Sequence, residues 1–363
     1  MKIKKFLQNI FKYFFQFLFK IIYGEIKYDK YALFKDNVYI KKIVSKKIIN
    51  FKKKAYRVYR IPNGIIYTDT VENVAIIKNN KIIENISFQQ VGGDLKNSKN
   101  NVTIYKGTPR FKKKISGNIL SLVQGASGQR NYSHWLFDIL PKIKLYSLIY
   151  PLKKIDYFYF DKLIKFQDET LKLINLDKIK IINSSKYRHV QADQVYATEH
   201  PWYNKGYVLD EAKKLPPWII HWLRKTFLNK AKKFKINKKV FIDRSDSEKH
   251  HCNIINNKEV SSYLISKGFT SYKLSSLSFV NQVYLFANAK IIIGPHGAGL
   301  TNLTFCKPKT KIIEIRPIYN QNSVYKTISK INNLNYNLIK TPKVKNNTKG
   351  DILIDLNMLK KII

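Results

Sequence analysis

From Lys238 onward, short apolar runs alternate with segments whose apolar positions recur every three to four residues. The runs predict strands and the periodic segments predict helices. The pattern gives strands at 239–243, 269–273, 290–293 and 311–315, and helices at 257–267, 278–288 and 300–305. Strands alternating with helices in this way are typical of a parallel, doubly wound sheet. We therefore predict an α/β domain at 236–335, followed by a C-terminal tail, 336–363, to which the pattern assigns no role.

The preceding part of the chain has a more mixed pattern. Alternating runs predict strands at 57–61, 73–77, 102–105, 119–123, 155–160 and 178–182. An apolar helix is expected to begin near Asn131, after a polar loop at 124–130. Another is expected at 208–231, with a start or a break at Pro216 and Pro217. We interpret residues 25–235 as one domain, so that the chain of 363 residues holds two domains of ordinary size.

The first segment, 1–24, predicts a helix with two unlike sides. Its polar residues recur near four-residue spacing: Lys5, Gln8, Asn9, Lys12, Gln16 and Lys20. At about 100° per residue they share one stripe, and Phe and Leu cover the rest. Lys12 and Lys20 interrupt any membrane span, which needs about 20 apolar residues. We expect an amphipathic helix lying in the plane of a membrane surface. The alternative is a helix packed on the protein's own core.

Composition changes this picture little. The formal net charge is +43, but 59 of the 67 basic residues are Lys, spread along the whole chain without an arginine-rich block. No specific nucleic-acid partner is therefore expected, whereas a basic surface suits an anionic membrane. Abundant Lys, Ile and Asn indicate an A/T-rich coding bias of the kind found in low-GC bacteria.

The two cysteines, Cys252 and Cys306, are too few for a disulfide framework and favour a reducing compartment. His250, His251 and Cys252 are adjacent, and adjacent side chains rarely converge on one metal ion. The carboxylates within 243–247 flank an arginine and indicate a strand-end turn. No metal and no bound cofactor is expected.

Two segments carry candidate chemistry. The first contains Gly294, His296, Gly297, Ala298 and Gly299. Glycines between a strand and a helix bring backbone N–H groups together at a positive helix end and leave room for an anion, although any tight α/β corner uses the same pattern. In the second, Asn131, His134 and Asp138 share one helical face. A carboxylate one turn from an imidazole raises its basicity, as a general base requires. Alternatively, the two satisfy each other and Asn131 is an N-cap.

Three blocks in the same order resemble glycosyltransferase family 61. They are 131–141, Phe241–Ser245, and 294–305 followed by Ile313–Pro317, and the resemblance covers about residues 120–317. It implies a GT-B fold, with two Rossmann-like domains facing a cleft. It further implies a nucleotide sugar on the C-terminal domain, an acceptor on the N-terminal domain, and direct displacement with inversion. One departure is that the family often has paired arginines and an Asn-Glu pair where this chain has His250-His251 and Asn256-Asn257.

The expected roles follow from this resemblance and from strand-end positions. His134, helped by Asp138, is the expected base, and Asn131 lies beside it in the cleft. The expected donor-binding residues are Arg244, Gly294, His296, Gly297, Ala298, Gly299, Asn302, Glu314 and Arg316. Among these, Glu314 is assigned to ribose hydroxyls and Arg316 or Arg244 to phosphate. Helix-end amides, His296 and Arg then stabilise the departing diphosphate without a metal ion.

These observations predict an inverting, metal-independent glycosyltransferase, peripheral on the cytoplasmic face of the inner membrane of a bacterium. Its partners would be a nucleotide sugar, a glycan or lipid-linked acceptor in surface polysaccharide synthesis, and an anionic membrane surface. One alternative is a membrane-associated, non-catalytic binding protein that retains the fold, which the departures within 250–257 favour. The other is a basic nucleic-acid-binding protein.

Overall fold

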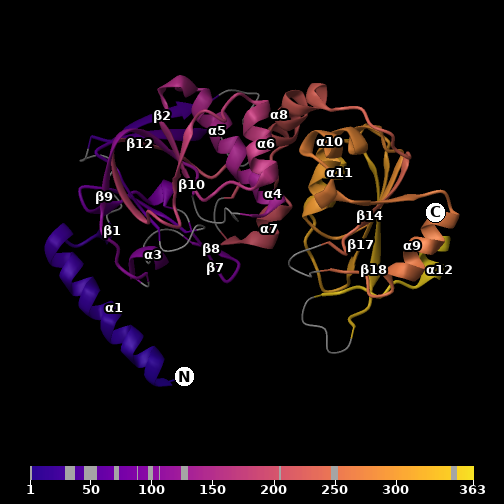
Figure 1. Cartoon of the computed structure of the whole chain (residues 1–363), viewed down its shortest axis with the longest axis horizontal. Coiled ribbons are helices and arrows are strands. Elements are labelled where there is room, and N and C mark those ends of the chain that lie inside the picture. Colours follow the sequence, from indigo (N-terminus) through magenta and orange to yellow (C-terminus); the bar gives the residue numbers. More distant parts are fainter. Residues whose placement is uncertain are drawn as a thin grey trace. The chain divides into compact units, whose positions relative to one another are not determined.

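A computed structural model of the chain shows a mixed α/β protein that divides into two compact units (Figure 1). Unit 1 comprises Met1–Ile164 and Leu176–Glu211, and unit 2 comprises Lys165–Asn175 and Ala212–Ile363. The structure describes residues 2–28, 37–44, 55–68, 73–87, 89–96, 101–105, 107–123, 130–203, 206–246, 252–344 and 350–363. The predicted loop at 124–130, apart from Arg130, and both His250 and His251 lie outside these ranges.

The main sheet of unit 1 is ten-stranded and mixed. Its strands are β1 (Lys27–Tyr28), β2 (Tyr39–Ile43), β3 (Tyr56–Pro62), β4 (Ile65–Tyr67), β5 (Ala75–Lys78), β6 (Lys81–Ile82), β9 (Lys113–Ser121), β10 (Tyr157–Phe160), β11 (Lys180–Asn183) and β12 (His189–Thr198). Strands β12, β9, β10 and β11 pair in parallel in that order. Beyond β12 the pairs are antiparallel except at the edge, where β1 pairs with β6 in parallel. A second, antiparallel sheet joins β13 (Gly206–Tyr207), β8 (Asp94–Lys96) and β7 (Gln89–Val91).

The helices described before residue 212 are α1 (Lys2–Tyr23), α3 (Val102–Tyr105), α4 (Tyr132–His134), the π-helix η3 (Trp135–Ile139), α5 (Leu140–Ser147) and α7 (Val208–Ala212), with short 3-10 turns η1 (Glu84–Ile86) and η4 (Leu152–Lys154). The strand predicted at 102–105 is wrong, because α3 forms there. Asn101 starts this turn, since its side-chain oxygen accepts the Thr103 N–H and its carbonyl accepts the Ile104 N–H. The Gln89 side chain, from strand β7, accepts a hydrogen bond from the Val102 N–H. A local sequence pattern cannot show this contact.

Unit 2 is built on a five-stranded parallel sheet, which confirms the parallel sheet predicted from the alternating pattern. Its strands are β14 (Lys239–Asp243), β15 (Thr270–Lys273), β16 (Ile291–Pro295), β17 (Lys311–Pro317) and β18 (Asn335–Thr341), in the order β15-β14-β16-β17-β18. Numbered along the unit, this is the doubly wound order 2-1-3-4-5, whose winding reverses between the first and third strands. Ligands of such sheets bind at the carboxyl ends of those strands. Here these are β14 and β16.

Helices cover both faces of this sheet. One face is covered by α9 (Asn257–Ser266) and α12 (Leu356–Lys360), and the other by α8 (Pro217–Phe227), α10 (Phe279–Asn288), the 3-10 helix η7 (Ala298–Phe305) and α11 (Val324–Ile331) (Figure 1). The remaining elements of the unit are α6 (Lys165–Leu173) and the 3-10 turns η5 (Leu228–Lys230) and η6 (Leu274–Ser276).

The bounds of unit 2 differ from the predicted domain at 236–335. On the N-terminal side of the predicted domain, Arg224 of α8 donates to the carbonyls of Thr304 and Cys306, at 2.7 Å each. In α6, the Glu169 carboxylate accepts the Phe279 N–H at 2.7 Å. Both segments therefore belong with the parallel sheet of unit 2, although they precede its first strand.

The C-terminal segment also belongs to unit 2. Strand β18 completes the sheet, and Ile352, Ile354 and Leu359 are buried in the same apolar cluster as Phe241. The predicted separate tail at 336–363 is thus part of the core, because its alternating apolar residues close one face of the sheet.

Leu359→Ala should therefore lower the free energy of unfolding by about 2–5 kcal/mol, because it removes fully buried methyl groups and leaves a cavity. Leu353→Ala is the matched control, since Leu353 is 50% exposed and should change stability little. Urea unfolding followed by circular dichroism measures both. Equal midpoints for the two variants would contradict a core role for this segment.

Candidate functional site

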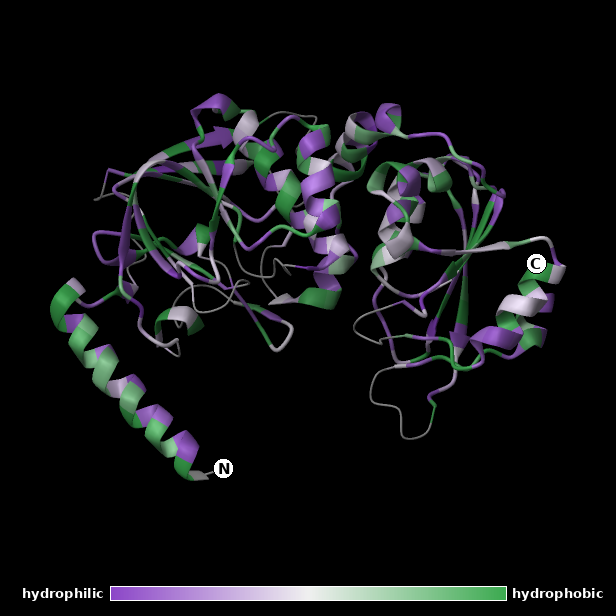
Figure 2. Cartoon of the chain, in the orientation of Figure 1, coloured by the Kyte–Doolittle hydropathy of each residue, from purple (hydrophilic) through white to green (hydrophobic). Residues whose placement is uncertain are grey.

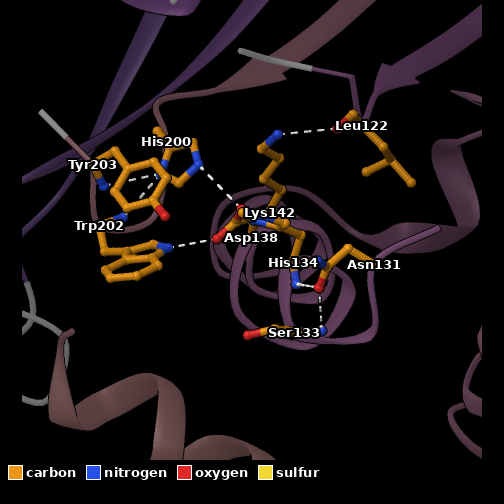
Figure 3. A network of polar contacts seen from close by, with 9 residues as sticks. All are labelled: Leu122, Asn131, Ser133, His134, Asp138, Lys142, His200, Trp202 and Tyr203. Carbon is orange, nitrogen blue, oxygen red and sulfur yellow. Dashed lines mark hydrogen bonds and ion pairs between the residues drawn. The ribbon is translucent and has the colours of Figure 1, made fainter. Parts of the chain in front are cut away.

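Unit 1 holds an imidazole–carboxylate pair on one helical segment (Figure 3). The Asn131 side-chain oxygen caps this segment by accepting the N–H groups of Ser133 and His134, at 2.9 and 3.3 Å. Asn131 therefore acts as the N-cap of this helix, as the second of the two interpretations of this segment expected. The chain then passes from α4 into the π-helix η3, a rare turn that is frequent at functional sites.

His134 and Asp138 bond to each other along this turn. His134 Nδ1 lies 2.6 Å from Asp138 Oδ2. The Asp138 side chain is completely buried, whereas 29% of the His134 side chain is exposed. When Nδ1–H is donated to the carboxylate, the basic lone pair of the ring is on Nε2. The pair is thus arranged as an oriented base with a buried partner.

Two residues from the turn after β12, Trp202 and His200, approach Asp138. Trp202 Nε1 lies 2.5 Å from Asp138 Oδ1, and His200 Nε2 lies 3.8 Å from Asp138 Oδ2. Burial opposes ionisation of Asp138, but the imidazoles of His134 and His200 outweigh it and hold the pKa of this carboxyl below its usual range. Asp138 is therefore ionised at neutral pH.

Lys142 follows one turn after Asp138. Its side chain is completely buried and Nζ donates to the Leu122 carbonyl at 3.0 Å. Burial lowers the pKa of Lys142 to about 7, although the charge of Asp138 acts in the opposite direction. An amine buried beside this carboxylate is costly, and such conflicts between sequence and burial cluster at functional sites.

Unit 2 holds a second pair of the same design. His296, which follows β16, places Nδ1 2.6 Å from Oε1 of Glu314 on the neighbouring strand β17. The Tyr336 hydroxyl donates to the other carboxylate oxygen at 2.5 Å. Burial and the nearby Glu314 both raise the pKa of Tyr336, so it remains a neutral donor. Glu314 is completely buried, and 9% of the His296 side chain is exposed.

This arrangement differs from the ribose-binding role expected for Glu314. Both of its oxygens accept hydrogen bonds inside the unit, so its observed contacts orient His296. Asn302 also differs from a donor-binding residue, since it is buried in η7 and donates to Gln282 of α10 and to the Gly299 carbonyl. It joins two helices instead of facing a ligand.

The glycine loop meets Arg244 at the reversal point of the sheet. A Cβ added to Gly297 would overlap the guanidinium of Arg244, so any other residue at this position would displace the arginine side chain. Gly294 and Gly299 have packing roles, because added Cβ atoms would lie 2.9 Å from Ile242 and 2.7 Å from Leu274. Ala298 begins η7 directly after the loop.

Arg316 lies near the end of β17, on the same face of the strand as Glu314. Its side chain is buried, and Nε and Nη1 have no hydrogen-bond partner in the part of the chain that the structure describes. A buried guanidinium without partners is costly unless an anion binds it. Arg244 and Arg316 thus bring positive charge to the carboxyl edge of one sheet, where His296 also lies.

The described positions at which the sequence departs from the family pattern make contacts within unit 2. Asn256 donates to the Ile354 carbonyl and Asn257 to the Asp243 carboxylate, which ties α9 to its surroundings. Among the described residues, no group of three His, Cys, Asp or Glu side chains is placed to hold a metal ion.

The sequence did not identify Lys142, His200, Trp202 or Tyr336. Of these, only Lys142 had a local signal, a charged residue on an apolar helix at the same spacing that separates His134 from Asp138. The others reach their carboxylates from distant strands and turns.

The family model described as Glycosyltransferase 61 matches residues 132–313, which include His134, Asp138 and His296 and end one residue before Glu314. No curated protein matches the chain.

Replacing Gly297 tests whether Arg244 needs the space that a side chain at position 297 would fill. Gly297→Ala and Arg244→Ala should each weaken pyrophosphate binding by about tenfold, the effect of one lost charged hydrogen bond. The double variant should bind no more weakly than Arg244→Ala, because both changes act on one guanidinium. Isothermal titration calorimetry measures this, with exposed Lys307→Ala as the control. Fully additive losses would show that the two residues act separately.

Proposed function

Because the chain belongs to glycosyltransferase family 61, we propose that this glycosyltransferase is inverting and metal-independent. It moves a sugar from a nucleotide-sugar donor to a hydroxyl of a glycan or lipid-linked glycan in surface polysaccharide synthesis. The observation that carries the proposal is the His134–Asp138 pair, an oriented imidazole on a buried carboxylate.

In the proposed reaction, the acceptor oxygen attacks the anomeric carbon while the bond from that carbon to the diphosphate oxygen breaks. The hydroxyl proton passes to His134 Nε2. Asp138 accepts the Nδ1–H and stabilises the imidazolium that forms. A single displacement inverts the anomeric carbon.

Unit 2 supplies the charge that the leaving diphosphate needs. We assign the diphosphate to the carboxyl edge of the sheet, where Arg244, Arg316 and His296 lie with the amides of the glycine loop. Glu314 and Tyr336 then keep His296 in one orientation. The two guanidinium groups support a reaction without a metal ion. For the His134–Asp138 and His296–Glu314 pairs to act on one donor and one acceptor, the two units must adopt the GT-B arrangement. That arrangement is part of this proposal.

His134→Ala should lower kcat by about 10²–10⁴-fold, because general-base catalysis is lost, and leave the Kd of the donor nearly unchanged. His296→Ala should instead weaken binding of the nucleoside diphosphate. A donor screen by product mass finds the substrate, and calorimetry then gives Kd.

Exposed His221→Ala on α8 is the control for both variants. Equal losses of turnover and affinity in His134→Ala would remove His134 as the base. Saturable donor binding without any product would indicate a binding protein that retains the fold.

We further propose that α1 holds the enzyme at the cytoplasmic face of a bacterial inner membrane. The helix contacts unit 1 by its polar side: Gln16 donates to the Gly107 carbonyl, and the Tyr23 hydroxyl accepts the Lys112 N–H. Phe19, on the same side, is buried with its ring 4.9 Å from that of Phe111.

Hydrophobic residues recur along α1 (Figure 2), and those on the side opposite Gln16 are exposed. Phe6, Ile10, Phe14, Phe17 and Ile21 lie on this side and are each more than half exposed. No helix in the described ranges is long and apolar enough to cross a bilayer. An exposed apolar face with lysines at its edges fits in-plane binding to anionic lipids, and this surface would bring a lipid-linked acceptor close.

Replacing Phe14 and Phe17 by Glu should reduce co-sedimentation with phosphatidylglycerol vesicles at least about tenfold, because each change removes an exposed aromatic ring that would insert into the membrane surface and adds a repelled charge. Ile265→Glu, at an exposed apolar position on α9, is the matched control. Phosphatidylcholine vesicles should bind the wild type more weakly. Light scattering that shows a dimer dependent on Phe14 and Phe17 would assign the surface to a second copy instead.

A further inference from the structure

The turn after β12 carries residues that approach Asp138 from outside its own helix. Figure 3 shows His200, Trp202 and Tyr203 to one side of the helix that carries His134, Asp138 and Lys142. We propose that His200 and Trp202 are positioning residues for the His134–Asp138 pair, and that His200 remains a neutral imidazole with its proton on Nε2. Its catalytic meaning rests on the proposed function, but the protonation state of His200 does not.

The hydrogen bonds of His200 determine its tautomer. Nδ1 accepts the backbone N–H groups of Trp202 and Tyr203, at 3.3 and 3.0 Å. A backbone N–H only donates, so Nδ1 must carry a lone pair. The single proton of the neutral ring is then on Nε2, the atom 3.8 Å from Asp138 Oδ2. Asp138 therefore faces an N–H dipole of His200.

Burial and ring stacking hold the His200 ring in this orientation. The His200 side chain is 1% exposed, and its ring stacks on that of Tyr203 at 4.5 Å and 11°. Protonating Nδ1, or turning the ring over, would leave two buried backbone donors without an acceptor, at a cost of about 1–3 kcal/mol each. Of the two imidazoles beside Asp138, only His134 is therefore suited to take up a proton.

Trp202 completes the positioning. Its Nε1–H lies 2.5 Å from Asp138 Oδ1, so that Oδ2 remains directed towards His134. Neither Trp202 nor His200 donates to the reacting atoms in the proposed reaction. They hold the charge that stabilises His134 when it becomes an imidazolium.

Lys142 and Tyr203 are further titratable residues near the His134–Asp138 pair. Lys142 neighbours Asp138 on the same helix, and burial lowers its pKa to about 7. On the side of the turn, burial and the charges of Asp138 and Glu211 raise the pKa of Tyr203 well above its usual value, so Tyr203 is neutral. Of these two groups, Lys142 is therefore the one whose pKa lies near 7 beside Asp138.

Nitrogen-15 NMR of the intact protein tests the tautomer without any variant. The His200 ring should show the signals of an Nε2–H tautomer and no titration between about pH 5 and 8, whereas His134 should titrate. A His200 that titrates in this range, or that carries its proton on Nδ1, would overturn the proposal. This holds whether or not a donor sugar is found.

Trp202→Phe tests positioning, because it retains an aromatic ring and deletes one donor to Asp138. The charge of Asp138 then acts more strongly on His134, so the pKa of His134 should rise by about half a unit or more. The acid limb of the kcat/KM profile should move by the same amount. An unchanged or lowered His134 pKa in the folded variant would overturn the role. Trp222→Phe in unit 2 is the matched control and should change neither value. If no donor gives product, the NMR shift still decides the role of Trp202.

Discussion

Both units depend on a carboxylate that is completely buried. Removing a carboxylate from water is expensive unless donors replace the water. Asp138 meets this constraint with His134 and Trp202, and Glu314 meets it with His296 and Tyr336. In each pair one oxygen accepts from an imidazole and the other from an aromatic donor. The consequence is an imidazole whose tautomer and orientation are set by the protein core.

The two pairs nevertheless suit different tasks. His134 is the more exposed, and its partner lies one helical turn away on a π-helix, which suits proton transfer with a substrate. His296 is nearly buried at a strand end, between a glycine loop and two arginines, which suits a bound anion. The reversal of strand order between β14 and β16 explains why Arg244 and Gly297 meet there. Sheet topology and the two arginines thus both support the anion site that we propose at this edge.

Sequence reasoning succeeded where contacts are local or periodic. The strands and helices between Lys239 and Pro317 follow from alternating apolar runs, and the pairing of His134 with Asp138 follows from their spacing. It failed where a distant side chain decides the conformation. Gln89 and Asn101 turn Val102–Tyr105 into helix, and the apolar residues of the C-terminal segment become core only because a sheet face is open to them.

The sequence by itself thus determined the α/β class, the parallel sheet of unit 2 and the family, because these rest on periodicity and on contiguous motifs. Only the tertiary structure decided which carboxylate oxygens are occupied, and so separated Glu314 as an orienting residue from Arg316 as a buried cation without a partner among the described residues. It also brought His200 and Trp202 to Asp138 across more than sixty positions of chain. The physical reason is that a buried charge must be solvated by whatever donors folding places around it, and the identity of those donors depends on long-range packing.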